Sequence, residues 1–258
     1  MRALPPDDDG MPAALQLEEP AKHLASLVMN ESFGRLTDVL LSQWLRLEDF
    51  EPLKRHGIYP LNRALFFGPP GNGKTVSAQL IASKLDCPLY RVRSEALITS
   101  YLGETTQSVG FVMDWLEDQE QCVVLWDEAE AIFPSRERMD GSGSAREMTN
   151  AMTVFWQRLD RWKSPQLFLL ATNMKDRLDP ALCSRIELQL EFGPPTAQQA
   201  RDVLSYWSEV LHEYGAETWG RRMQAAIDDG HLPESFRALW QDIANAVRSQ
   251  VALGVGTS

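Results

Sequence analysis

The stretch "GPPGNGKT" at residues 68–75 decides the fold class of this chain. It matches the pattern G-x-x-x-x-G-K-[ST], in which the glycines let backbone N–H groups turn inward and surround a phosphate group. That pattern requires a strand before it and a helix after it. The apolar run "RALFFG" at residues 63–68 predicts the strand, and apolar residues at helical spacing over residues 74–85 predict the helix. We therefore predict a phosphate-binding loop at the end of a buried strand.

The side chains of this loop suit a nucleotide and its metal ion. Lys74 can reach the oxygens of the outer phosphates, and the hydroxyl of Thr75 can ligate Mg²⁺. The alternative, an ordinary glycine-rich turn, would not need a strand before it and a helix after it. The residues that we expect to bind the nucleotide are Gly68, Pro69, Pro70, Gly71, Asn72, Gly73, Lys74, Thr75 and Val76.

A second stretch, "VVLWDEAEAIF" at residues 123–133, supplies the carboxylates that such a loop needs. It is an apolar strand that ends at Asp127 and Glu128. We expect Asp127 to hold Mg²⁺ through water and Glu128 to orient or deprotonate the attacking water. The alternative interpretation is an acidic first turn of a helix, where carboxylates are favourable in any case.

Two further polar residues follow the next predicted strand, "LFLLAT" at residues 167–172. Asn173 stands at the tip of that strand, where it could hydrogen-bond the γ-phosphate or the attacking water. Arg185 comes twelve residues later, and its guanidinium could stabilise charge on the transferred phosphoryl group in a neighbouring subunit. The alternatives are an ordinary turn asparagine and a surface ion pair between Arg185 and an adjacent carboxylate.

The order of predicted elements gives the fold class. Apolar runs alternate with helical patterns, so we expect an α/β fold with a parallel sheet flanked by helices, as in P-loop NTPases. From "GPPT" onward every pattern is helical, which predicts a small all-helical lid subdomain. The predicted division is an acidic, disordered tail over 1–22, the α/β ATPase core over 23–193, the helical lid over 194–251 and a flexible tail over 252–258.

Composition excludes several function classes. The chain has 25 Lys and Arg against 36 Asp and Glu, a net charge of −11, which disfavours nucleic-acid and anionic-membrane partners. The cysteines Cys87, Cys122 and Cys183 have neither a disulfide nor a zinc spacing. The start lacks an apolar signal core, and no apolar run approaches a membrane span. We therefore expect a soluble cytoplasmic protein with no membrane partner.

The four motifs, in this order, resemble those of the AAA+ ATPases over residues 35–250. The most specific points are "GPPGNGKT", "VVLWDEAEAIF", "LLATN" and "LDPALCSRIE". The resemblance implies an enzyme that hydrolyses ATP to ADP and phosphate with Mg²⁺ as cofactor. It also implies that Asp127 and Glu128 are Walker B, Asn173 is sensor 1, and Arg185 is an arginine finger. The sequences of these motifs are most similar to those of the AAA clade of protein remodellers.

Two departures from that clade concern arginines. The clade usually has an Arg-Pro-Gly-Arg arrangement near the finger, whereas "CSRI" offers only Arg185. In "SFRALW", Arg237 stands where many AAA+ proteins have a sensor 2 arginine that contacts the nucleotide. The alternative for Arg237 is an exposed arginine at the start of a helix.

The stretch "TSYLGET" at residues 99–105 is similar to the pore loop of this clade. By that resemblance Tyr101 projects into a central pore and grips extended polypeptide with its aromatic face. Leu102 supports it, and Gly103 lets the loop hinge. The resemblance thus implies a homo-oligomeric, hexameric ring that remodels, unfolds or disassembles a partner protein.

Two alternative functions remain open. One is an ATP-dependent conformational switch that regulates a partner enzyme. The other is a nucleic-acid-directed AAA+ ATPase, which would need basic residues on its pore loops; residues 94–110 contain none, and only Arg136, Arg138 and Arg146 favour it. Because only residues 1–62 precede the P-loop strand, we expect no substrate-recruiting domain and a separately encoded protein partner or substrate.

Overall fold

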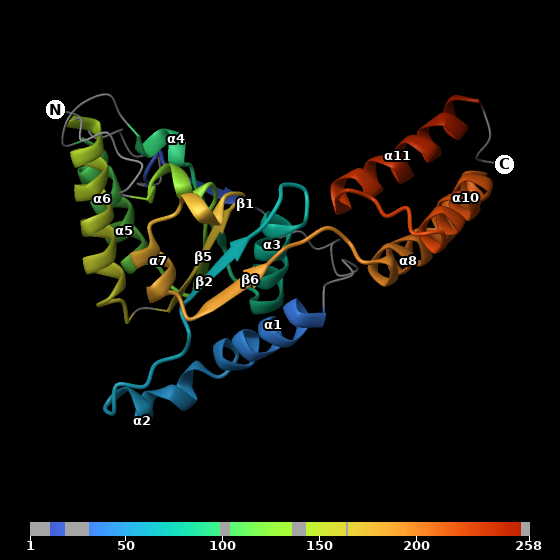
Figure 1. Cartoon of the computed structure of the whole chain (residues 1–258). Helices are drawn as coiled ribbons and strands as arrows, with labels where there is room; N and C mark the ends of the chain where they lie inside the picture. Colours follow the sequence, from blue (N-terminus) through green and yellow to red (C-terminus); the bar gives the residue numbers. More distant parts are fainter. Residues whose placement is uncertain (1–10, 19–30, 99–103, 136–142, 164, 254–258) are drawn as a thin grey trace.

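A six-stranded sheet forms the centre of the molecule (Figure 1). The computed structural model describes residues 11–18, 31–98, 104–135, 143–163 and 165–253. Five strands of the sheet are parallel, in the spatial order β3 (Leu89–Val92), β4 (Cys122–Trp126), β5 (Gln166–Thr172), β2 (Arg63–Phe67) and β6 (Leu188–Glu191). The predicted strands and the predicted fold class, a P-loop sheet flanked by helices and followed by a helical part, are confirmed.

The sixth strand, β1 (Leu15–Glu18), was not predicted. It pairs antiparallel with β3, so that Leu15 lies opposite Val92 and Glu18 lies opposite Leu89. The expectation of a disordered tail over residues 1–22 is therefore wrong for residues 15–18. The acidic, proline-containing sequence around this short strand predicted disorder. The strand is ordered because its backbone pairs with β3 and because Leu15 is buried.

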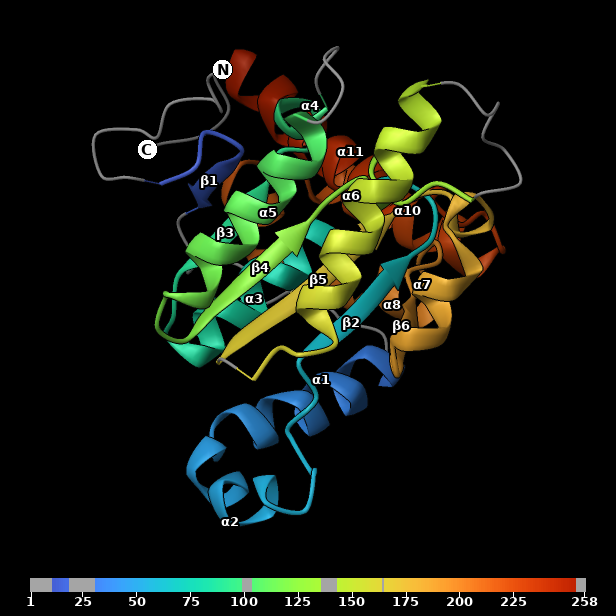
Figure 2. The same ribbon diagram turned by 90° about the vertical axis from the view of Figure 1, so that its left-hand side faces the viewer.

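Helices cover both faces of the sheet (Figures 1 and 2). The helices α5 (Glu104–Glu117) and α6 (Gly143–Leu159) pack on one face, and α1 (Glu31–Trp44) and α3 (Lys74–Leu85) pack on the other. In β4, Val124 and Trp126 belong to the first core and Val123 and Leu125 to the second. This alternation explains why the strand reads as a continuous apolar run.

Short elements connect these layers. They are η1 (Leu47–Phe50), α2 (Glu51–Lys54), α4 (Ser94–Leu97), η2 (Ala129–Ala131), η4 (Lys175–Arg177) and α7 (Pro180–Arg185). Among them, α7 carries Arg185, which the sequence analysis singled out. Among the helices that the structure describes, none has both the length and the apolar character needed to cross a membrane.

After β6 the chain leaves the sheet and forms only helices in its described part. They are α8 (Ala197–Tyr206), α9 (Ser208–Glu213), α10 (Glu217–Asp228) and α11 (Phe236–Ala252). A capping box of Thr196 and Gln199 starts α8, and a separate apolar core that includes Leu204, Leu239 and Ile243 holds the helices together. Like the predicted lid, this unit consists of helices. The exact division at residue 194 remains a prediction.

The loop after β2 depends on a close backbone approach at Gly68. Its φ of 136° is a conformation that residues with a side chain rarely adopt. A Cβ atom there would lie well inside contact distance of the carbonyl oxygen of Phe192, while Phe192 N donates a hydrogen bond of 2.7 Å to the carbonyl of Phe67. The end of β2 and the end of β6 are thus pressed together around a residue that has no side chain.

We expect Gly68→Ala to lower the free energy of unfolding by about 2–3 kcal/mol, because the added methyl group meets backbone atoms and forces a strained φ. Gly193→Ala is the matched control, since a Cβ there meets no atom within 4 Å. Urea unfolding of the two variants measures the difference. Equal stability of both would contradict the close approach.

Candidate functional site

The loop over residues 68–73 joins β2 to α3 at the carboxyl edge of the sheet. Gly68 N donates to the carbonyl of Thr172 at 3.3 Å, which fastens the loop to β5. Gly73, with φ 92°, starts α3, and no side chain caps the first N–H groups of that helix. Uncapped N–H groups at a helix start attract anions. The backbone therefore has the form that a phosphate group requires.

Lys74 lies over this loop. Its Nζ donates to the carbonyls of Gly68 at 2.7 Å and Pro69 at 3.0 Å, and the residue is only 7% exposed. Burial lowers the pKa of Lys74; the carboxylates of Asp127 and Glu130 oppose this shift, and the guanidinium of Arg237 adds to it. The charge of Lys74 is therefore influenced by carboxylates that follow β4 and by an arginine of the helical unit.

Asp127 directly follows β4 and faces the start of α3. Thr75 Oγ1 donates to its Oδ2 at 3.3 Å, and the backbone N–H of Glu128 donates to its Oδ1 at 3.0 Å. Arg91 NH2 lies 2.8 Å from the same Oδ2. A hydroxyl and a carboxylate side by side are ligands that Mg²⁺ accepts together with phosphates and water, so these two residues fit the predicted ion. The described residues contain no larger metal-binding group of His, Cys, Asp or Glu.

Glu128 has an unusual backbone. Its φ of 52° and ψ of 46° are left-handed, a conformation that a glutamate seldom adopts, and its side chain is exposed. Such strain occurs most often at functional sites. The sequence analysis selected this residue as the catalytic base but could not predict its backbone conformation.

The sequence analysis missed Glu130. Its Oε2 is buried and has no hydrogen-bond partner among the described residues, which is rare for a carboxylate oxygen. The negative charge of Glu130 also raises the pKa of Lys74, against the larger effect of burial. The signal was the third acidic residue of "DEAE", which we assigned no role.

Asn173 directly follows β5, at the same edge of the sheet, with an exposed side chain. The turn that carries it is held by Thr172, whose Oγ1 accepts from the backbone N–H of Met174 at 2.9 Å. The structure thus places Asn173 at the strand tip, beside the strands that end at the loop and at Asp127. Its predicted role remains a prediction.

Arg185 has neighbours away from the loop. Its NH1 donates to the carbonyl of Ala181 at 2.9 Å, its Nε lies 3.5 Å from Asp160 Oδ2, and its guanidinium lies 5.5 Å from the ring centre of Trp156. Among the described residues, its recorded partners all lie outside residues 68–75. Within one chain the surface ion pair that we considered as the alternative is therefore present, and the predicted action on a neighbouring subunit remains a prediction.

The helical unit contacts the loop directly through the start of α11 (Figure 1). The backbone N–H of Arg237 donates to the carbonyl of Gly71 at 3.0 Å, and that of Phe236 donates to Asn72 Oδ1 at 3.3 Å. A Cβ at Gly71 would meet Arg237 Cβ at 3.0 Å and Ser235 Oγ at 3.1 Å. Arg237 is thus brought to the loop, with its side chain exposed, whereas the contacts of Asn72 and Ser235 were not predicted.

Tyr101, Leu102 and Gly103, the predicted pore loop, lie outside the described residues.

Burial raises the pKa of the Cys87 thiol to about 11 and that of the Cys122 thiol to about 12. Both cysteines are free and protonated at neutral pH, as expected for thiols without a redox role.

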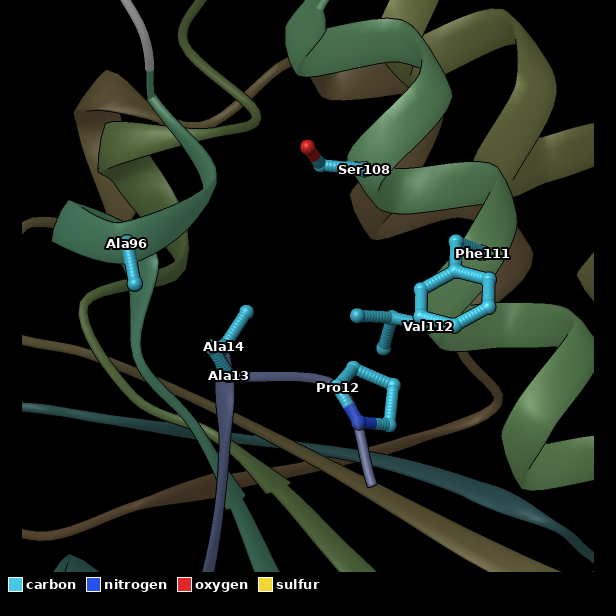
Figure 3. Close-up of a pocket in the computed structure, with 7 residues that line it drawn as sticks. All are labelled: Pro12, Ala13, Ala14, Ala96, Ser108, Phe111 and Val112. Atoms are coloured by element: carbon cyan, nitrogen blue, oxygen red, sulfur yellow. The ribbon is translucent and has the colours of Figure 1, made fainter. Parts of the chain in front are cut away.

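A small hollow lies elsewhere, between the segment before β1, α4 and α5 (Figure 3). It is lined by Pro12, Ala13, Ala14, Ala96, Ser108, Phe111 and Val112. None of these side chains is charged, and none belongs to the predicted site. The hollow therefore offers nothing that would bind a phosphate group.

Comparisons with known proteins identify the family. A family model described as "ATPase family associated with various cellular activities (AAA)" matches residues 64–194. The "Probable 26S proteasome regulatory subunit 10B" of Caenorhabditis elegans is 33% identical over 221 residues, which are 83% of this chain and 53% of that protein. The "26S proteasome regulatory subunit 7" of Dictyostelium discoideum is 32% identical over 214 residues, 81% of this chain and 49% of that protein.

A bacterial relative has a similar match. The "Uncharacterized AAA family ATPase y4kL" of Sinorhizobium fredii (strain NBRC 101917 / NGR234) is 30% identical over 179 residues, 69% of this chain and 52% of that protein. The chain thus spans about half the length of the curated relatives that it matches.

Proposed function

The chain belongs to the AAA family of ATPases, and from that premise we propose that it assembles into a ring and uses ATP hydrolysis to unfold or remodel a partner protein. Binding of nucleotide and hydrolysis of ATP are properties of the family. The ring, the partner and the residue roles below are our proposal. It is carried by one observation: Lys74, Thr75 and Asp127 meet at one edge of the sheet, with the start of α11 against the same loop.

In the proposed site each residue has a task. The backbone N–H groups of residues 68–73 and the ammonium of Lys74 bind the phosphates. Thr75 and Asp127 would hold Mg²⁺, whose charge offsets that of the transferred phosphoryl group. Glu128 accepts the proton of the attacking water, and its exposed side chain leaves room for that water. Asn173 orients the same water from the tip of β5.

The lid and the neighbouring subunit complete the site. Arg237 reaches the nucleotide from the start of α11, which already bonds to the loop. Arg185 leaves Asp160 and contacts the nucleotide of the next subunit, so that hydrolysis requires assembly. The start of α11 is hydrogen-bonded to the loop at residues 68–73. Loss of the γ-phosphate would therefore move the lid, and movement of the lid would move the pore loop. We propose a hexamer and a separately encoded protein substrate.

We expect Glu128→Gln to keep ATP affinity within about threefold of the original chain and to lower the turnover number by at least about 100-fold, because the general base is lost. ATP binding and phosphate release are measured on the same preparation. Glu120→Gln, at an exposed position before β4, is the matched control and should hydrolyse ATP normally. A fully active Glu128→Gln chain would remove Glu128 from the proposed mechanism.

Arg185→Ala should abolish hydrolysis and spare nucleotide affinity, because the arginine acts on the next subunit. Mixing equal amounts with Glu128→Gln subunits should restore part of the phosphate release, since each variant supplies what the other lacks. Arg158→Ala is the control, because Arg158 is also a partly exposed arginine in an ion pair, with Asp114. No recovery in the mixture would contradict action across an interface.

Tyr101→Ala should leave basal ATP hydrolysis within about twofold and remove most ATP-dependent binding of fluorescein-labelled casein, an unfolded probe, because the aromatic face is lost. Tyr101→Phe keeps the ring and should bind the probe normally. Equal binding by all three chains would count against a pore grip and would favour the conformational switch.

A further inference from the structure

A chain of polar side chains leads away from Asp127. Arg91 stands at its centre: NH2 lies 2.8 Å from Asp127 Oδ2, and NH1 lies 3.4 Å from Glu18 Oε1. Glu18 Oε2 accepts in turn from Gln79 Nε2 at 3.1 Å. With the bond from Thr75 to Asp127, these contacts form a chain whose two ends, Thr75 and Gln79, both lie on α3, and we call these five residues the Arg91 network.

Three regular spacings bring the network together. Gln16 in β1 lies opposite Arg91 in β3. Glu18, two residues further along β1, is therefore on the same face of the sheet as Arg91. Arg91 is level with Leu125 in β4, and Asp127, two residues further on, shares that face as well.

The helix α3 supplies the other side. Thr75 and Gln79 are four residues apart, so they lie on the same side of α3. One side of this helix thus meets two carboxylates, and Arg91 joins the two carboxylates to each other. The antiparallel strand β1, which the sequence did not predict, is the element that adds Glu18.

The charges of the network decide what it can do. The side chains of Glu18 and Asp127 are 12% and 18% exposed, so their mutual effects are screened less than on an open surface. Arg91 compensates one of the two negative charges. Because Glu18 also interacts with Arg91, the guanidinium neutralises only part of the charge of Asp127, and Asp127 can still attract a cation. Without Glu18, the full guanidinium charge would act on Asp127.

We propose that Arg91 and Glu18 are positioning residues that set the Mg²⁺ affinity of the ATP-loaded site. Arg91 orients Asp127 and competes with a cation for Oδ2, and Glu18 draws the guanidinium away. The inference rests on the proposed function in one respect, the role of Asp127 toward Mg²⁺. It adds two residues, one from β1 and one from β3, that do not themselves contact the nucleotide.

The charges predict opposite signs for the two single variants. Glu18→Gln keeps the shape of the side chain and leaves Arg91 uncompensated, so the metal concentration at half-saturation should rise about three- to tenfold. Arg91→Gln removes the competing charge, so that concentration should fall by a similar factor, while turnover decreases because Asp127 loses a donor. The double variant restores the original net charge and should lie near the original value.

The experiment uses the full chain and Mn²⁺ as the probe in place of Mg²⁺. Electron paramagnetic resonance of free Mn²⁺, in the presence of a non-hydrolysable ATP analogue, gives the metal affinity without turnover. The Mg²⁺ dependence of ATP hydrolysis is measured on the same variants. Glu95→Gln is the matched control, because it removes an exposed carboxylate that lies 3.0 Å from Arg93, in the same part of the molecule. It should leave both quantities unchanged.

The outcomes separate this inference from the proposed function. If Asp127→Asn weakens Mn²⁺ binding but Glu18→Gln and Arg91→Gln shift it no more than Glu95→Gln does, the inference is overturned and the proposed site stands. If Asp127→Asn itself leaves metal affinity unchanged, the proposed metal site is overturned. Arg91→Gln tests the interaction between Arg91 and Glu18 without a substitution in β1. The result is therefore decisive even if Glu18→Gln loosens β1.

Discussion

The strands β4, β5 and β2 are parallel neighbours, so their carboxyl ends meet at one edge of the sheet. Each of these strands is buried by helices on both faces, so most side chains along its length are apolar. They collect where the strands end. The loop at residues 68–73, Asp127 with Glu128, and Asn173 all stand at such ends, and the site is a consequence of this arrangement.

The same edge also joins the two parts of the chain. The start of α11 bonds to the carbonyl of Gly71 and to the side chain of Asn72, and a side chain at Gly71 would press on Ser235 and Arg237. A group bound in the loop therefore touches the sheet and the helical unit together. On the other side, β1 reaches Asp127 through Glu18 and Arg91. The loop at residues 68–73 thus contacts the start of α11, and Asp127 is linked to β1 through Arg91 and Glu18.

Local patterns in the sequence predicted a parallel sheet with the strands β2, β4 and β5, the helix after the loop and the residues at the strand ends. Their signals are local: an apolar run, a glycine spacing, a polar residue after a strand. The left-handed backbone of Glu128, the buried Oε2 of Glu130 and the pairing of β1 depend on contacts between distant segments, which no local spacing records. The ion pair of Arg185 with Asp160 was considered only as an alternative, because a sequence cannot show which carboxylate is near.

We propose that the chain assembles into a ring that hydrolyses ATP at this edge of the sheet and grips a polypeptide. Electron cryo-microscopy of the Glu128→Gln chain, purified with ATP and with the partner that it retains, tests this claim most directly. We expect a closed ring with nucleotide between residues 68–75 and the start of α11, and an extended polypeptide against Tyr101 in the central pore. Nucleic acid in that pore, or single chains that bind ATP without assembling, would contradict it.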